Sequence, residues 1–187
     1  MRMAAEVTVK DRGAMDGKND VVQGIIDGLD YSLEPLNTKE KTEAFKDPPD
    51  SGGLLLALYQ YRQMLVYGPK GFVGEFSHGG NEPFYPPPAD VKEKPDYAKL
   101  RVDTEVLRTK HAGIPGKWYF SLKDDGTRGQ LLGFEVTADR DEDPCEVYLS
   151  QYKDVDGRKL PHHIEVRSGN GVYAVLEVSA YKLEAGK

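Results

Sequence analysis

The sequence has little of what covalent, membrane or nucleic-acid chemistry requires. Its 187 residues include one cysteine, Cys145, so no internal disulfide can form, and we expect this side chain to be a small buried hydrophobe. The longest apolar run, 54–58, is far too short to cross a bilayer as a helix. The net charge is −6 and lysines and arginines form no cluster, which argues against a nucleic-acid partner.

The first six residues contain no apolar stretch of the kind that a signal peptide needs. We therefore predict no signal peptide within this sequence. Two cases remain for the compartment: a cytosolic protein, or an exported protein whose leader lies outside the sequence.

Motifs for catalysis and metal binding are incomplete. Ser51 stands in an Asp-Ser-Gly-Gly sequence, but no histidine precedes it, as one would in a trypsin-type chain. The acidic run 139–143 begins like a calcium loop and is then followed by proline where the loop needs glycine. His162 and His163 are adjacent and would point to opposite faces of a strand, away from a shared metal. We expect no catalytic residue, no metal site and no cofactor.

Strand and turn patterns dominate from residue 54 onward. The apolar and aromatic run 54–67, followed by a Gly-Pro-Lys-Gly turn and 72–77, predicts a hairpin. Apolar and charged residues alternate along 100–106, and the last third reads as successive strands joined by short turns such as 154–157. These patterns predict a mainly β (α+β) fold. It is a curved antiparallel sheet or half-barrel of about eight or more strands, with one or two N-terminal helices.

The first 53 residues differ in pattern from the rest. Val7 and Val9 alternate as in a short strand, whereas apolar residues at helical spacing over 20–29 predict a helix. A second short helix is expected near 38–45. We predict an N-terminal extension, 1–53, that carries a helix and packs on the sheet, and an antiparallel β domain, 54–187. Whether 1–53 belong to that domain or remain from a longer chain stays open.

Aromatic residues are the feature most relevant to binding, since the chain has 11 Tyr, 6 Phe and 1 Trp. Ordinary packing within a sheet explains many of them, because aromatic residues favour strands. The alternative is that some line a concave apolar surface able to hold a lipid, an acyl chain or an apolar peptide. The residues predicted for such an apolar cradle are Tyr59, Tyr61, Met64, Trp118, Phe120, Phe134, Tyr148 and Tyr173.

Three segments give the chain a family resemblance. The run 143–166 contains a strand ending in tyrosine, a Val-Asp-Gly turn and a Leu-Pro that opens the next strand. Together with the hairpin 118–136, it resembles the closing strands of the outer-membrane lipoprotein-sorting (LolA-type) superfamily. The run 61–72 adds a closer similarity to the C-terminal domain of some bacterial trypsin-like (HtrA-type) serine proteases. The resemblance covers about Leu54 to Leu183 and implies a half-barrel closed by helices that cradles an apolar lipid moiety.

From these patterns we expect a non-catalytic LolA-like module of the cell envelope. It would bind a lipid-like ligand, an acylated protein or another protein partner. One alternative is a C-terminal accessory domain of a trypsin-like serine protease, without a ligand of its own. The other is a structural interaction protein that pairs through an exposed sheet edge. The concave face distinguishes them, because a carrier needs it open and an accessory domain has it filled by its own helix.

Overall fold

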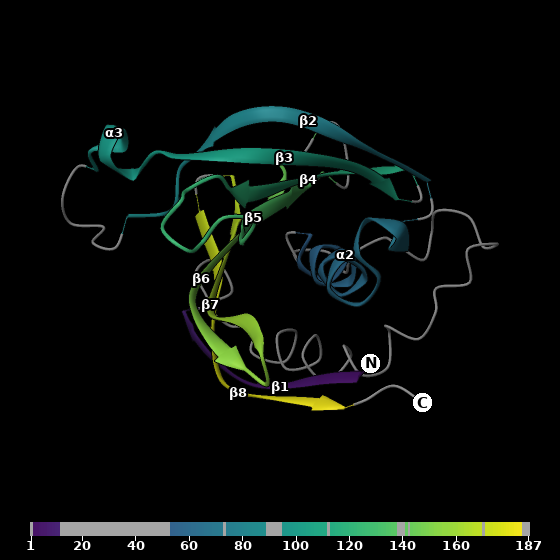
Figure 1. Ribbon diagram of the computed structural model, residues 1–187, viewed down its shortest axis with the longest axis vertical. Helices are drawn as coiled ribbons and strands as arrows, with labels where there is room; N and C mark the ends of the chain where they lie inside the picture. The colour runs from purple at the N-terminus through teal and green to yellow at the C-terminus, as the bar shows by residue number, and fades with distance from the viewer. Residues whose placement is uncertain are drawn as a thin grey trace.

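A single curved antiparallel sheet wraps around one helix (Figure 1). The computed structural model describes residues 2–11, 53–72, 74–88, 95–111, 113–137, 141, 143–169 and 171–184. The sheet has eight strands in the order β1-β8-β7-β6-β5-β4-β3-β2. The strands are β1 (Arg2–Asp11), β2 (Gly74–Phe84), β3 (Val102–His111), β4 (Ile114–Ser121), β5 (Leu131–Val136), β6 (Cys145–Val155), β7 (Arg158–Ser168) and β8 (Gly171–Glu184). The helical elements are α2 (Leu54–Tyr67), the 3-10 turn η3 (Gly68–Gly71) and α3 (Tyr97–Leu100). The predicted mainly β fold with a curved antiparallel sheet is confirmed.

The prediction of a strand over 54–67 was wrong, because this segment is helix α2. Its apolar residues follow one another without a period of two, so a buried strand and a buried helix could not be separated by pattern alone. Its 14 residues exceed the usual length of a strand and include many good helix formers. Gly68 ends the helix with a φ of 64° and donates its N–H to the carbonyl of Met64. Instead of closing a hairpin with 54–67, β2 pairs with β3.

The concave side of the sheet faces α2 (Figure 1), and the main core lies between them. We call this set of side chains the inner core. Trp118 of β4 is fully buried and stacks on Phe134 of β5, with 4.5 Å between ring centroids. Tyr61 of α2 stacks on the same Phe134 at 5.4 Å, so that α2 and the sheet share one aromatic stack. The remaining inner core comes from Leu54, Leu56, Ala57, Phe72, Val136, Cys145, Val147, Leu149, Ile164, Val166, Tyr173, Ala174, Leu176 and Val178.

The alternation and turns expected from the sequence explain why the strands run side by side. Val155 pairs with Arg158 across a two-residue turn in which Asp156 and Gly157 have φ values of 52° and 75°. Positive φ at both positions is what the tightest hairpin turn needs, and the turn predicted at 154–157 is confirmed. Cys145, as expected, is buried.

The N-terminal strand β1 lies beside the last strand, β8, with Arg2 opposite Glu184. The short strand expected around Val7 and Val9 is therefore present and joins the same sheet. The helices predicted at 20–29 and 38–45 lie outside the described residues, so the division of the chain at residue 53 stays a prediction. Among the described residues, no helix has the length and apolar character needed to span a membrane.

Candidate functional site

The structure brings most of the predicted cradle residues together between α2 and the sheet. Tyr61, Trp118, Phe134 and Tyr173 belong to the inner core, and Met64 and Phe120 pack against it half-buried. Tyr59 is buried on α2, with its ring 5.6 Å from that of His111. The predicted surface is thus covered by the protein's own helix.

Tyr148 lies apart from the other predicted cradle residues. It lies on the outer face of the sheet, whereas its neighbours Val147 and Leu149 are in the inner core. The reason is the pleat of β6, since successive side chains of a strand point to opposite faces. The outer face therefore carries a second set, the outer cluster, formed by Phe84, Val106 and Tyr119 with Leu132 and Tyr148.

Several polar side chains are buried between α2 and strands β3 and β4. The hydroxyl of Tyr59 lies 3.3 Å from Nε2 of His111, and Trp118 donates its indole N–H to Thr109 at 2.9 Å. Burial lowers the pKa of His111 below its ordinary value, which keeps the ring neutral. Gln60 is fully buried, and its side-chain nitrogen and oxygen have no hydrogen-bond partner among the described residues. This unpartnered amide destabilises the fold, because a buried polar group without a partner keeps its desolvation cost.

His162 and His163 point to opposite faces of β7, as the sequence suggested, whereas His78 and His111 lie in strands β2 and β3. His163 contacts Glu177 at 2.8 Å on the outer face, whereas His162 packs edge-on against Tyr181, which belongs to the inner side. In the described part of the chain, no group of three or more His, Cys, Asp or Glu side chains is arranged to hold a metal ion. Ser51 and most of 139–143 lie outside the described residues.

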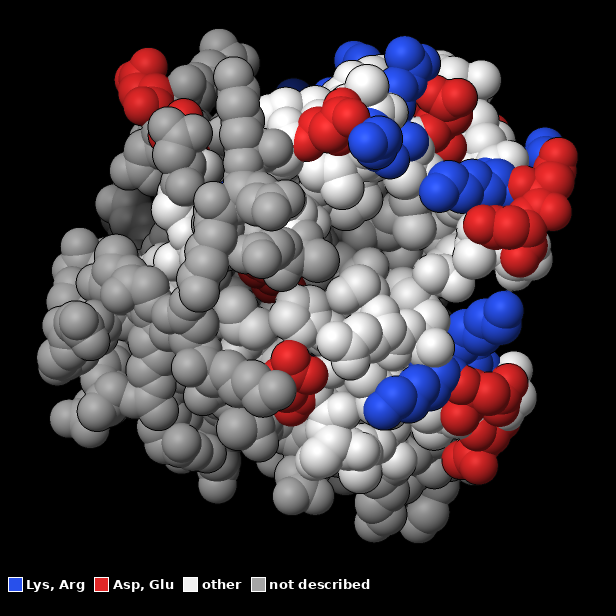
Figure 2. All heavy atoms as spheres, turned by 90° about the vertical axis from the view of Figure 1, so that its left-hand side faces the viewer, with Lys and Arg blue, Asp and Glu red and all other residues white. Residues whose placement is uncertain are grey.

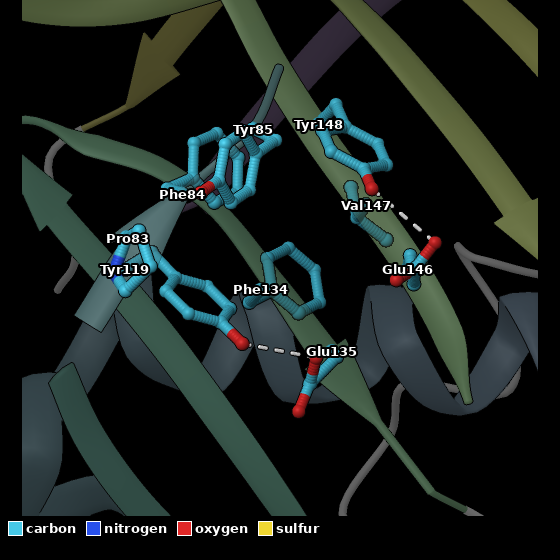
Figure 3. Close-up of a pocket in the computed structure, with 9 residues that line it drawn as sticks. All are labelled: Pro83, Phe84, Tyr85, Tyr119, Phe134, Glu135, Glu146, Val147 and Tyr148. Atoms are coloured by element: carbon cyan, nitrogen blue, oxygen red, sulfur yellow. Dashed lines mark hydrogen bonds between the residues drawn. The ribbon is translucent and has the colours of Figure 1, made fainter. Parts of the chain in front are cut away.

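A cavity of about 150 Å³ opens on the outer face, above the outer cluster (Figure 3). We call it the outer cavity. It forms because Phe84, at the end of β2, lies over the outer face of β5. Gly133 of β5 leaves room for the Phe84 ring, since a Cβ added at Gly133 would lie 2.8 Å from that ring. Its lining consists of Pro83, Phe84, Tyr85, Tyr119, Phe134, Glu135, Glu146, Val147 and Tyr148.

Two tyrosine–glutamate pairs line the outer cavity, and the tyrosine of each pair lies near the ring of Phe84 (Figure 3). The Tyr119 hydroxyl donates to Oε2 of Glu135 at 3.0 Å, and the Tyr148 hydroxyl donates to Oε2 of Glu146 at 3.2 Å. Burial raises the pKa of both tyrosines, with the nearby carboxylates adding to the effect, so each hydroxyl stays a proton donor. Phe84 lies 5.2 Å from the ring of Tyr119 and 5.6 Å from that of Tyr148.

The two carboxylates differ in their charge partners, although β5 and β6 place them directly opposite each other. Lys117 lies 3.5 Å from Glu135 and 2.9 Å from Glu82. Glu146 has no cation within 4.0 Å in the described residues, since the neighbouring Arg167 donates to Glu165 at 2.6 Å. Burial raises the pKa of Glu146, and the charge of Glu135 adds to this, partly offset by Tyr148 and Arg167.

The side of the molecule that lies to the left in Figure 1 carries paired charges beside uncharged surface. Figure 2 views this side of the molecule: basic and acidic side chains lie next to one another along one edge, and much of the described surface between them is uncharged. Ion pairs of this kind involve Arg108 with Glu82 and Arg128 with Asp124, both at 2.9 Å.

The outer cavity was missed from the sequence, although one signal for it was present. The strands carry large side chains on both faces, which predicts a second covered surface. Which residues would meet on that surface depended on the register between β4, β5 and β6.

The fold and the site define a half-barrel whose hollow holds a helix and whose outer face carries an aromatic, acidic cavity. No protein-family model, no curated protein and no solved structure matches this chain. The LolA-type resemblance noted in the sequence remains a prediction.

Proposed function

We propose that this chain is a non-catalytic binding module of the LolA-like type that acts through a protein partner in the cell envelope. Its hollow does not carry lipid in this proposal. The observation that supports it is the position of α2, which occupies the concave side of the sheet (Figure 1). A trypsin-like serine protease domain is the partner favoured by the family resemblance, with this chain as its accessory domain.

The energetics of the hollow support a structural helix rather than a displaceable lid. Leu54, Leu56 and Tyr61 of α2 are each no more than 7% exposed. Removing α2 from the sheet would expose these three side chains at a cost of about 5–9 kcal/mol, at about 1.5–3 kcal/mol for each. An acyl chain would have to bury about 6–11 methylene groups, at about 0.8 kcal/mol each, merely to offset that loss. An apolar ligand with fewer methylene groups than this cannot displace α2 from the sheet.

Binding of a fluorescent long-chain fatty acid to the full chain tests this proposal, together with native mass spectrometry of the purified protein. We expect no saturable binding and no co-purifying lipid. Stoichiometric binding that unlabelled fatty acid displaces would overturn the proposal in favour of a carrier.

A pair of helix variants sharpens the test. Leu56→Ala removes a buried side chain that holds α2 on the sheet, whereas Tyr67→Ala changes a side chain that is 62% exposed at the end of the helix. If α2 is structural, Leu56→Ala lowers the stability of the fold and produces no acyl binding, and Tyr67→Ala changes neither. If α2 is a lid, Leu56→Ala makes acyl binding tighter than in the wild type.

The protease partner is tested by adding the chain to a purified trypsin-like protease of the envelope and measuring association by analytical ultracentrifugation. Association at micromolar concentration supports the accessory role. An absence of association with such proteases, combined with saturable acyl binding, contradicts it.

A further inference from the structure

We propose that the Tyr148–Glu146 half of the outer cavity binds a lysine side chain of the protein partner. This inference rests on the proposed function, because it names the chemistry by which that partner is recognised. It is carried by the arrangement of the two tyrosine–glutamate pairs around Phe84, of which one is occupied by a cation and the other is not.

The occupied half shows what this surface accommodates. Nζ of Lys117 lies 3.5 Å from Glu135 and 5.6 Å from the centroid of the Tyr119 ring. An ammonium group above an aromatic face is attracted by the ring's quadrupole, and the adjacent carboxylate supplies a full opposite charge. The protein thus already holds one lysine on a tyrosine–glutamate pair of this cavity.

The other half repeats the arrangement without the cation. Tyr148 donates to Glu146 as Tyr119 does to Glu135, and its ring is tilted by 41° against Phe84, the same angle as that of Tyr119. Glu146 is half-buried and forms no ion pair within the described residues. A carboxylate in this environment gains from an incoming cation more than an exposed one would, because water screens it less.

Three cations and four carboxylates form the ion pairs and the tyrosine–glutamate hydrogen bond discussed here, and three of these carboxylates have a cation within 4.0 Å. The cations are Arg108, Lys117 and Arg167, and the carboxylates are Glu82, Glu135, Glu146 and Glu165. Within the part of the chain that the structure describes, the carboxylate of this set without a cation within 4.0 Å is Glu146, and Asp143 adds a further negative charge that acts on it.

Arg167 is the internal competitor for this position. It lies opposite Glu146 in the register of β6 and β7, but its Nε donates to Glu165 at 2.6 Å. Turning toward Glu146 would break that bond. Removing Arg167 therefore leaves the cavity more negative and should tighten the binding of an external lysine.

The size and shape of the cavity favour one slender side chain. A volume of about 150 Å³ holds a few methylene groups and an ammonium. Aromatic rings on its walls bury the methylene groups, and the carboxylate receives the charged end, as expected for long cationic side chains. The exposed ring of Tyr85, at 41%, marks the side from which a partner would enter.

The test uses a five-residue blocked peptide with a central lysine, titrated into the full chain and followed by NMR shifts of Tyr148 and of the Glu146 side chain. We expect saturable shifts at these two residues. Lysine acetylation, which removes the charge, should abolish binding, and tetramethylammonium should compete with the peptide. Glu146→Gln should weaken binding at least tenfold, and Arg167→Gln should strengthen it.

A matched control is Glu105→Gln, which removes the same charge from a side chain that is 55% exposed and pairs with His78. It should leave peptide affinity unchanged. Equal affinity for the lysine and acetyl-lysine peptides, or equal weakening by Glu105→Gln and Glu146→Gln, would overturn the proposal. The peptide affinity and its change in the variants are measured independently of fatty-acid binding. The lysine site can therefore be refuted without refuting the proposal that α2 fills the hollow. Saturable acyl binding, in turn, would count against the proposed function alone.

Discussion

Replacing Gly133 by alanine places a methyl group where the outer face of β5 meets Phe84. The new Cβ would lie 2.6 Å from the carbonyl oxygen of Val147 and 2.8 Å from the ring of Phe84. The first contact is with backbone and cannot be relieved by a change of rotamer. Either β5 and β6 shift, or the backbone of Gly133 moves toward the inner core, and both changes disturb the packing of Phe84 on β5.

The magnitude follows from these two contacts. Inserting a methyl group into a packed region costs about 1–3 kcal/mol. Phe84 is only 7% exposed, and its displacement loses part of the about 1.5–3 kcal/mol that burial of such a side chain contributes. Alanine gains about 0.4–1 kcal/mol relative to glycine by restricting the unfolded chain. We expect Gly133→Ala to lower the free energy of unfolding by about 2–4 kcal/mol on balance.

The assay is urea denaturation at 25 °C, followed by the fluorescence of Trp118, the one tryptophan of the chain, which is fully buried. Gly171→Ala serves as the matched control, since its Cβ would meet only the carbonyl of Ser168 at 3.8 Å. We expect this control to stay within about 1 kcal/mol of the wild type. A Gly133→Ala protein as stable as the control would refute the packing of Phe84 over β5 and, with it, the geometry of the outer cavity.

Three further predictions concern buried polar and charged groups. Gln60→Met should stabilise the fold by about 1–3 kcal/mol in urea denaturation, because it removes two buried polar atoms that have no hydrogen-bond partner among the described residues. An unchanged or lower stability would show that these two atoms do form hydrogen bonds in the folded protein. Burial lowers the pKa of His111, so the unfolded state binds more protons than the folded state. The stability of the wild type should therefore fall as the pH decreases below 6.5. A His111→Gln protein whose stability falls in the same way would contradict this. The pKa of Glu146 is raised, so its effect on the pH dependence of stability is opposite to that of His111. The folded state holds the proton of Glu146 more tightly than the unfolded state does. Glu146→Gln should therefore stabilise the fold at pH 8 by about 0.2–1 kcal/mol, which is the size of the repulsion between like charges across two strands. This gain should disappear below pH 4.5. A variant that is less stable than the wild type at pH 8 would argue against repulsion from Glu135.

The sheet was predictable because its signals are local. The alternation along β3 survives in the structure, where Val102, Thr104 and Val106 are buried between exposed neighbours. The turn between β6 and β7 needs positive φ at two adjacent positions, and Asp-Gly provides it within the sequence itself. Each of these features depends on residues a few positions apart.

Helix α2 could not be distinguished from a strand, because a helix that is buried on several sides has no polar face to give it a period. Seven of the eight predicted cradle residues are buried or half-buried on the inner side, as hydrophobicity suggests. Three of them belong to α2, the segment predicted as a strand, and this helix covers the other four. The outer cavity depends on longer-range information. Glu135 meets Glu146 only because of the register between β5 and β6, and Phe84 reaches them from a strand three positions away in the sheet.

The pairing of β1 with β8 has a consequence for the order in which the protein folds. Strands β2 to β8 each pair with the next strand along the chain, so their contacts form over short loops. Strand β1 pairs with residues 164 to 182 positions later, from Asp11 with Val175 to Arg2 with Glu184, and closing so long a loop is slow. During synthesis, β1 therefore leaves the ribosome before its partner β8 has been made. In that interval its backbone hydrogen-bonding groups are open to other strands, and a chaperone that shields residues 2–11 would speed productive folding.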